Sequence, residues 1–368
     1  MTESSEKIAK VRAYLTQHKL DGIVLNSRAN FAWLAGGGDN HVVSQSERGF
    51  GALVVTARSA WLLANRIEVD RLHTEEHLTA FTPKTFAWTE PIGDAAIKLI
   101  GDKVKAKRFA TDDPEIIPLQ KLPGDFNDEV RARLCEAEIR RFKGLGRDCA
   151  VVIETVARQL NPGDSEHQAE ADLAKHLLAR GIQPYVLLVA FDERIRRYRH
   201  PTPVQNHLRK CAMLVVCGQR NGLIASLTRL VHFGSPAVDL AQRHEKVCEV
   251  EAALWKATVP GAAWGKVLQV GIDAYKKAGF AKEWELHHQG GPTGYSGRDF
   301  LVTPDEKRKV QDFQAVAWNP SITGTKTEDT FILENGQRTV ITACSPEWPS
   351  LKIGSGKDQI VRPGILVR

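Results

Sequence analysis

The sequence predicts an α+β protein of two domains, a smaller α/β domain followed by a larger domain of mixed helices and strands. The chain has 368 residues, and a domain usually takes roughly 100–200. Residues 1–125 alternate short apolar runs with amphipathic segments, and the Pro/Gly/Asp-containing segment 122–129 is typical of a linker. Beyond it, long helical patterns flank several β-like runs. We therefore expect domains at 1–125 and 126–345, and a C-terminal tail at 346–368.

Four apolar runs of the first domain have the composition of strands. Helical periodicity lies between them, at 6–20 and 68–78. This βα alternation favours an α/β sheet. The four runs are 21–27, 50–57, 59–65 and 108–113.

The second domain opens with a helical pattern from about Asp128 to Leu160. The segment 161–164 stops it, Asp164 or Ser165 caps the next helix, and Gly181 ends that helix. Strands, two more helices and short β-like runs follow. They are 185–191, 212–218, 222–234, 236–258, 263–279, 315–333 and 338–345.

Composition excludes several classes of protein. Apolar residues make up 42% and charged residues 26%, as in a globular protein with a substantial core. No apolar stretch is long enough to span a membrane, and the N-terminus does not have the pattern of a secretory signal. The six cysteines are scattered, which favours reduced thiols in a cytoplasm. A net charge of +6 is too weak to indicate nucleic-acid binding.

Five short segments of the second half occur in an order that is typical of one superfamily. They are His200-Pro201-Thr202-Pro203, Ala225-Ser226-Leu227-Thr228-Arg229, Gly290-Gly291-Pro292-Thr293-Gly294, Trp318-Asn319-Pro320 and Thr327-Glu328-Asp329-Thr330. They resemble the H-x-x-P, S-D-I-T-R, G-H-G-I-G, E-P and R-x-E-D-T segments of the creatinase, prolidase and aminopeptidase P superfamily. In the first half, residues 30–36 resemble that group's N-x-x-Y-L-T-G turn. The resemblance covers about residues 8–345 and implies a creatinase-type N-terminal domain before a pita-bread domain.

The resemblance also shows where this chain departs from the superfamily. Its metallopeptidases hold two divalent metals with two Asp, one His and two Glu. Carried over by position, these fall near Val215 and on Ser226, Gly291, Asn319 and Glu328. Only Glu328 keeps its carboxylate, and hard divalent cations need several anionic oxygens. We therefore expect no metal and no cofactor, unless His287 and His288, three or four residues before the family histidine, hold one ion.

Without a metal to generate hydroxide, hydrolysis needs a base with a near-neutral pKa, which histidine supplies. His200 looks like the catalytic histidine of creatinase, which hydrolyses a C–N bond without metal. We predict His200 as the general base, with Glu328 as its partner and His288 as a third catalytic candidate. Three structural alternatives stay open: a surface position for His200, a tight turn at 287–288, and an ion pair of Glu328 with Arg229 or Lys326.

Other polar residues beside the five segments are expected to bind substrate. Asn319 would donate a hydrogen bond to a developing oxyanion, and one of the basic residues would pair with a substrate carboxylate. Thr228 stands where creatinase has its second functional Glu, so creatine is not the expected substrate. The expected substrate-binding residues are Tyr198, Arg199, Ser226, Thr228, Arg229, His287, Tyr295, Asn319 and Lys326.

The loop 36–49 of the first domain is glycine-rich, polar and long enough to be functional. It contains Asp39, Asn40 and His41. By resemblance we expect these residues to line the pocket of a partner subunit in a homodimer; the alternative is a plain surface loop.

Three functions remain open. The first is a metal-independent hydrolase of an amide or amidine-like C–N bond in a small polar metabolite or short peptide. The second is a metal-dependent Xaa-Pro-type aminopeptidase or dipeptidase with rearranged ligands. The third is a non-catalytic binding module, like the peptidase-like domains of histone chaperones that the superfamily includes.

Overall fold

The computed structural model describes residues 2–101, 103–356 and 359–368. It forms two compact units, Met1–Arg133 with Asn221–Leu223, and Leu134–Arg220 with Ile224–Arg368. The first unit therefore extends past the boundary expected after residue 125. The segment 346–368, expected as a tail, belongs to the second unit.

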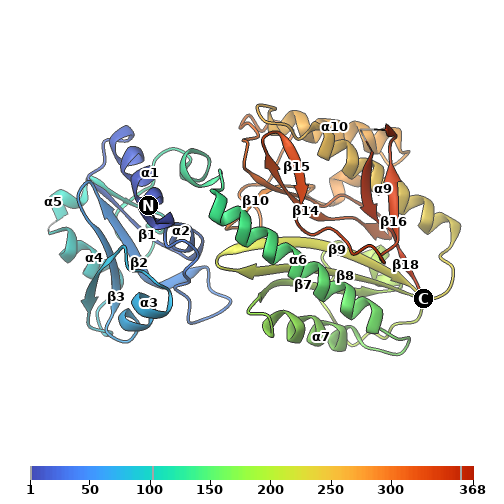
Figure 1. The fold of residues 1–368 in the computed structure, drawn as a ribbon, viewed down its shortest axis with the longest axis horizontal. Helices are drawn as coiled ribbons and strands as arrows, with labels where there is room; N and C mark the ends of the chain where they lie inside the picture. Colours follow the sequence, from blue (N-terminus) through green and yellow to red (C-terminus); the bar gives the residue numbers. More distant parts are fainter. Residues whose placement is uncertain (1, 102, 357–358) are drawn as a thin grey trace. The chain divides into compact units, whose positions relative to one another are not determined.

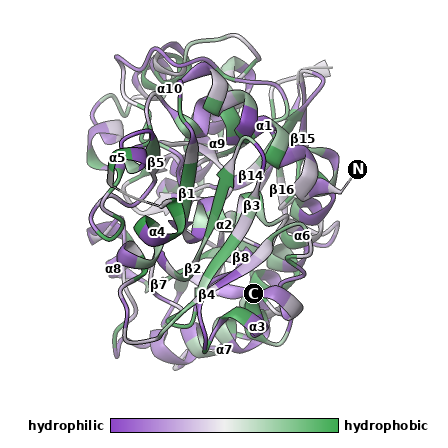
Figure 2. Cartoon of the chain, turned by 90° about the vertical axis from the view of Figure 1, so that its left-hand side faces the viewer, coloured by the Kyte–Doolittle hydropathy of each residue, from purple (hydrophilic) through white to green (hydrophobic). Residues whose placement is uncertain are grey.

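The first unit is an α/β domain around a six-stranded sheet of order β4-β3-β2-β1-β5-β6. The central strand β1 pairs antiparallel with β2 and parallel with β5, and both β1 and β2 are coloured as hydrophobic in Figure 2. The elements are α1 (Glu3–Gln17), β1 (Gly22–Ser27), α2 (Arg28–Leu34), β2 (Arg48–Thr56), β3 (Ala60–Asn65), α3 (Val69–Glu75), β4 (Thr82–Phe86), α4 (Ile92–Ile100), α5 (Lys103–Ala106), β5 (Phe109–Thr111), β6 (Gln120–Lys121) and the π-helix η1 (Asn127–Arg131). The four strands expected from the sequence correspond to β1, β2, β3 and β5.

The second unit contains two four-stranded sheets, β18-β9-β8-β7 and β10-β11-β14-β15. Helices α6 and α7 pack on β8 and β7, while α9 packs on β11, β12, β13 and β16 and pairs with α10 (Figure 1). The elements are α6 (Glu136–Gln159), α7 (Glu166–Leu178), β7 (Gln183–Phe191), α8 (Glu193–Arg197), β8 (Cys211–Arg220), β9 (Leu223–His232), α9 (Val238–Ala257), α10 (Trp264–Lys277), the 3-10 helix η2 (Glu283–Leu286), β10 (Gly290–Thr293), β11 (Ala315–Trp318), β12 (Ser321–Ile322), β13 (Thr325–Lys326), β14 (Asp329–Glu334), β15 (Gln337–Val340), β16 (Ser350–Ile353), β17 (Ile360–Pro363) and β18 (Leu366–Val367). This arrangement confirms the predicted α+β class.

The single helix expected from Asp128 to Leu160 is two helical segments in the structure. The chain leaves η1 after Arg131 and begins α6 at Glu136. The Glu138 carboxylate accepts a hydrogen bond from the Cys135 backbone N–H at 2.7 Å, which caps the new helix. Apolar periodicity continues through the break, so the pattern alone did not reveal it.

The start and end of α7 agree with the cap and the terminating glycine expected from the sequence. Of the two candidate caps, Ser165 is the N-cap, and Gln168 completes the capping box. The Asp164 carboxylate instead accepts from the Asn161 backbone N–H at 2.7 Å. Gly181 follows the helix with a φ of 65°, a conformation that favours glycine.

The C-terminal segment is built into the second unit. Strands β16 and β17 form a hairpin, and β18 lies parallel to β9. Arg362 of β17 is buried, pairs with Glu251 at 2.7 Å and Asp329 at 2.8 Å, and lies over the Trp255 ring. Residues 359–368 therefore complete the core of this unit.

No helix among the described residues combines the length and apolar character needed to cross a membrane. All six cysteines are free in the structure.

Candidate active site

Six polar side chains from separate segments of the second unit gather in one cluster, which we call the polar cluster. His200 follows α8, His287 and His288 precede β10, and Arg298 lies in the loop after β10. The short hairpin β12–β13 ends at Lys326, and Glu328 immediately precedes β14. The polar cluster consists of His200, His287, His288, Arg298, Lys326 and Glu328.

The three imidazole rings are in mutual contact. The Nε2 atoms of His200 and His287 are 2.9 Å apart. The rings of His287 and His288 are stacked, with centroids at 4.6 Å, and those of His200 and His288 are at 5.6 Å. An Nε2–Nε2 contact at this distance is a hydrogen bond through one proton, so one ring donates and the other accepts.

The environment keeps these histidines neutral. Burial, with the positive charge of Lys326, lowers the pKa of His287 to about 2. Burial and Arg298 lower the pKa of His288 to about 4. His200 is exposed, which is the surface position left open by the sequence. Partial desolvation of its ring still lowers its pKa, which Lys326 lowers further and Glu328 raises. Near neutral pH the rings of His287 and His288 therefore stay unprotonated, and His200, whose pKa Glu328 also raises, is the best proton acceptor of the three.

Glu328 is the negative centre of the polar cluster, and it is almost fully buried. Its carboxylate pairs with the Lys326 Nζ at 2.8 Å and the Arg298 Nη2 at 2.9 Å. The Thr228 hydroxyl donates a third bond at 3.0 Å. Burial alone would raise the pKa of Glu328, but the two cations lower it to about 2. The carboxylate is therefore ionised across the working pH range.

Ser226 and Thr228 lie on the same face of β9. The Ser226 hydroxyl donates to the Cys217 Sγ at 3.2 Å across the β8–β9 hairpin. Cys217 has a raised pKa because it is buried and Glu328 is near. Val215, where the family aspartate was expected, instead packs in an apolar cluster with Leu230.

Arg229 faces away from Glu328. Its guanidinium is buried, pairs with Asp329 at 3.1 Å and donates to the Thr342 carbonyl at 2.7 Å. Successive strand residues point to opposite faces. Thr228 and Glu328 therefore belong to one face, and Arg229 and Asp329 to the other. Of the two ion pairs considered for Glu328, the structure contains the one with Lys326.

Two other expected substrate-binding residues are engaged with protein partners, and a third is exposed. The Arg199 guanidinium donates to Thr323 at 2.9 Å and pairs with Glu283. The Tyr295 hydroxyl donates to Glu138 at 2.7 Å and is buried. Tyr198 is 49% exposed.

Asn319 is buried directly after β11, and its position is fixed by its backbone. Its N–H donates to the Gln289 carbonyl at 3.0 Å. Its side-chain Oδ1 has no hydrogen-bond partner among the described residues. The expected role of Asn319 towards an oxyanion stays a proposal.

The loop residues of the first unit form their own hydrogen-bonded group. Asp39 pairs with Arg28 at 2.9 Å and with His41 at 2.8 Å. Burial would raise the pKa of Asp39, but Arg28 lowers it below the ordinary value. Asn40 is fully buried and donates to the Asn26 and Gly51 carbonyls, so it anchors the loop to β1 and β2.

Two parts of the chain match known families. Residues 7–149 match the creatinase/prolidase N-terminal domain. Residues 141–340, more than half of the chain, match metallopeptidase family M24. The chain belongs to metallopeptidase family M24. Among curated proteins, none matches it.

Solved structures share this M24 fold over almost the whole chain. The Xaa-Pro dipeptidase from Bacillus anthracis is 16% identical, covers 99% of this chain and 100% of its own, and has a TM-score of 0.78. The X-Pro aminopeptidase from Thermotoga maritima is 14% identical over 100% of both chains, with a TM-score of 0.76. The N-terminal domain of the FACT complex subunit SPT16 from chickpea is 11% identical over 93% of this chain and 97% of its own, with a TM-score of 0.69. Such low identities show the fold alone.

The residues present do not fit the two-metal centre that the M24 family implies. At the position of the family histidine, Gly291 has a φ of 135°, and a Cβ atom there would lie 2.5 Å from the Val302 side chain. Both oxygens of Glu328 are already bound by protein cations. Ser226 and Asn319 supply no charge, so two divalent cations would lack the anionic oxygens they require.

The histidines are the part of this M24 site that could hold a metal. One ring nitrogen from each of His200, His287 and His288 lies within 4.8 Å of the others. Neutral imidazoles suit Zn²⁺, Cu²⁺ or Ni²⁺. The neighbouring Lys326 and Arg298 oppose such an ion, because their charge already lowers the pKa values of these rings.

Arg298 and Cys217 are the site residues that sequence reasoning missed. Arg298 lies in a loop without periodicity, thirty residues before Glu328, and no pattern links the two. Cys217 could have been found, because the Asn221-Gly222 turn of a two-residue hairpin places it opposite Ser226.

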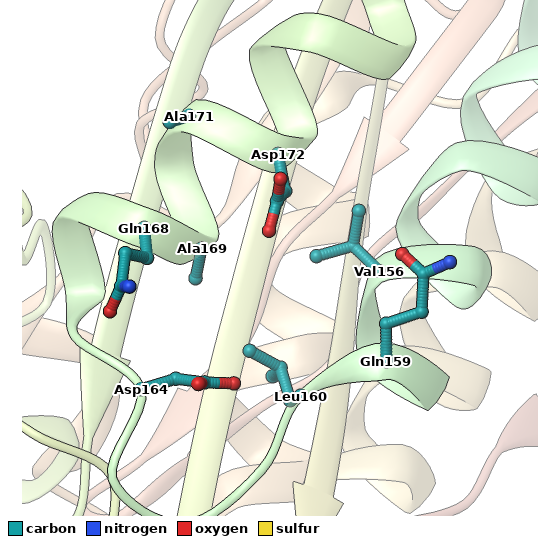
Figure 3. A pocket seen from close by; sticks show the side chains of 8 residues that line it. All are labelled: Val156, Gln159, Leu160, Asp164, Gln168, Ala169, Ala171 and Asp172. Carbon is teal, nitrogen blue, oxygen red and sulfur yellow. The ribbon is translucent and has the colours of Figure 1, made fainter.

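Figure 3 shows a separate hollow of the second unit, between the end of α6 and the start of α7. None of the expected site residues lines it. Its lining residues are Val156, Gln159, Leu160, Asp164, Gln168, Ala169, Ala171 and Asp172.

Proposed function

We propose that this M24 protein hydrolyses a C–N bond of a short peptide or small polar amide without its family's two-metal centre, with His200 as the general base. The observation that carries this proposal is that protein cations, in place of metal ions, neutralise the Glu328 carboxylate. Lys326 and Arg298 supply the positive charge beside this carboxylate, and three neutral imidazoles lie next to them. The fold shared with Xaa-Pro dipeptidases and aminopeptidases supports a peptide substrate.

The histidine contact explains how His200 would act as a base. Its Nε2 is engaged with His287, so the nitrogen that accepts a proton from water is Nδ1. Protonated His200 then donates from Nε2 to His287, which stays neutral because its pKa is about 2. Glu328 stabilises the resulting imidazolium, since its charge raises the pKa of His200.

The proposed reaction consumes only the substrate and one water molecule. As His200 takes the proton of water, the hydroxide oxygen forms a bond to the carbonyl carbon. The developing oxyanion would accept hydrogen bonds from the cationic donors or the Asn319 amide. The C–N bond then breaks, and His200 returns its proton to the leaving amine.

A panel of Xaa-Pro dipeptides, assayed for released amino acids with and without a chelator, tests this proposal. Turnover should be insensitive to the chelator. His200→Ala should lower kcat by about 10²–10⁴-fold, the usual contribution of a general base. The matched control is His207→Ala, which removes an exposed histidine of the same region and should leave turnover unchanged. Full activity of His200→Ala would contradict the assigned role.

A second candidate is a peptidase that holds a single transition-metal ion on the three histidines. The convergence of their ring nitrogens within 4.8 Å favours it. In that case chelation would abolish turnover and added Zn²⁺, Cu²⁺ or Ni²⁺ would restore it. A panel without any turnover would instead favour a non-catalytic binding module, the third function open from the sequence.

A further inference from the structure

The segment that carries His200 has no regular structure to hold it. Helix α8 ends before it, and residues 198–206 belong to no helix or strand. Within the segment, the Thr202 carbonyl accepts from Arg194 of α8 at 2.8 Å, which ties the segment back to its own helix. The position of His200, with its Nε2 at 2.9 Å from that of His287, therefore depends on further side-chain contacts.

Arg199, the residue before His200, makes such contacts. Its guanidinium pairs with Glu283 and donates to the Thr323 hydroxyl at 2.9 Å. Glu283 begins η2, the 3-10 helix that ends directly before His287. The two paired side chains are only 17% and 16% exposed. Arg199 and Glu283 therefore join the segment of one histidine to the segment of the other.

Glu283 also holds the hairpin that carries Lys326. Its carboxylate accepts from the Thr323 backbone N–H at 3.0 Å and from the Thr323 hydroxyl at 2.8 Å. Thr323 lies in the turn between β12 and β13, and β13 ends at Lys326. One carboxylate therefore links three segments that carry residues of the polar cluster.

His287 is held separately, through its backbone. The Gln289 side-chain amide donates to the His287 carbonyl. Its Oε1 accepts from the hydroxyl of Tyr275, a fully buried residue, at 2.8 Å. Of the two rings in contact, His200 is therefore the one whose position depends on the pair of Arg199 with Glu283.

We propose that Glu283, acting through Arg199, is a positioning residue that holds His200 against His287. The hydrogen bond of one ring nitrogen decides where a histidine carries its proton. When His200 donates from Nε2 to His287, its Nδ1 is left to accept a proton from water. A ring released from this contact is free to carry its proton on Nδ1, where it no longer accepts one. The proposal deepens the proposed hydrolysis, on which it rests, by naming what orients the base.

The histidine contact can be measured without any substrate. In the full chain labelled with ¹⁵N at histidine, a hydrogen bond between two ring nitrogens gives a scalar coupling between their nuclei. The wild-type protein should show one such coupling, which His200→Ala removes. Glu283→Gln places an amide nitrogen against donors that need an acceptor, so the coupling should disappear. Glu285→Gln, a change of an exposed residue in η2, is the matched control and should keep it.

Kinetics separate positioning from substrate binding. Glu283→Gln should lower kcat by about 10–100-fold, as a displacement of about 1 Å can, and leave KM unchanged. Arg199→Met should have the same effect, and the double variant should be no worse than either single one, because both remove one link. Arg199→Lys, which keeps the charge, should retain more of the turnover than Arg199→Met.

Three results would overturn the proposal. The first is a wild-type protein without the coupling. The second is a coupling and a kcat that match those of the wild type in folded Glu283→Gln or, if that variant does not fold, in Arg199→Met. The third is a double variant in which the two losses of kcat multiply.

The two proposals fail separately. A coupling that depends on Glu283 in a protein without turnover of any peptide would contradict the hydrolysis and leave the positioning role standing. Turnover that needs His200 but not Glu283 would contradict the positioning role alone.

Discussion

The neighbouring residues Glu328 and Asp329, at the start of β14, place their charges on opposite sides of the chain. Glu328 faces the histidines and is held by Lys326 and Arg298. Asp329 faces the interior and is held by Arg229 and Arg362. The alternation of a strand separates them, so the same sequence segment supplies both the candidate site and the core of the unit.

The charge of Lys326 should set the pH dependence of turnover. The positive charge lowers the pKa of His200, so the neutral, active base persists to lower pH. Activity is lost as pH falls through that pKa. Lys326→Gln should therefore raise the pKa and move the acid limb of kcat/KM upward by about 0.5–1 pH unit.

The pH profile distinguishes this electrostatic effect from general damage. Lys352→Gln, a change of an exposed lysine on β16, is the control and should leave the limb in place. An acid limb in Lys326→Gln that is unmoved, or that lies at lower pH, would show that Lys326 does not act on His200.

At the residue scale, the sequence predicted five of the six residues that the structure brings together in the polar cluster. His200, His287, His288, Lys326 and Glu328 lie beside family segments, and the fold brings those segments together. The pairing of Arg298 with Glu328 could not be predicted, because it depends on the conformation of the loop after β10. The orientation of Arg229 could have been predicted, because successive residues of a strand point to opposite faces and Thr228 faces Glu328.

At the scale of elements, strand signals were reliable where both faces of a strand are buried, as in β1 and β9. Strand β4 gave no such signal, because four of its five residues are exposed and one is a proline at the sheet edge. The hairpin β16–β17 was also missed, since its burial alternates weakly. Buried Arg362 of β17 links this hairpin to Glu251 and Asp329.

Replacing that arginine should destabilise the second unit. In Arg362→Met, Glu251 loses its cation while it remains buried, and Asp329 loses one of its two arginine partners but keeps Arg229. The pKa of Glu251 is already about 7, because burial raises it against the effect of Arg362. Breaking such a buried pair costs about 3–5 kcal/mol, which urea denaturation would measure.

Lys352→Met lies in the same hairpin and is the control. As an exposed substitution it should change the free energy of unfolding by less than about 0.5 kcal/mol. A similarly small change in Arg362→Met would contradict the role given to Arg362 in attaching the C-terminal segment.

At the scale of the whole molecule, the α+β class followed from the alternation of apolar runs and helical patterns, and the family followed from five short segments in sequence order. Four of these segments lie in or directly beside β9, β10, β11 and β14, so their order along the chain is the order of these strands in the fold. The chemistry proposed here departs from the family, because the positions expected to hold metal ligands carry Ser226, Gly291 and Asn319 on a shared fold. The expected homodimer stays a prediction, which sedimentation analysis of the full chain would check.

We propose that the cations of Lys326 and Arg298 take the place of the family's metal ions beside Glu328. Elemental analysis of protein purified without chelator tests this most directly. The structure predicts well below one Mn, Co, Fe or Zn ion per chain in a preparation that hydrolyses its substrate, because Glu328 is already neutralised by Lys326 and Arg298. A near-stoichiometric content of any of these metals, lost together with turnover on chelation, would contradict it.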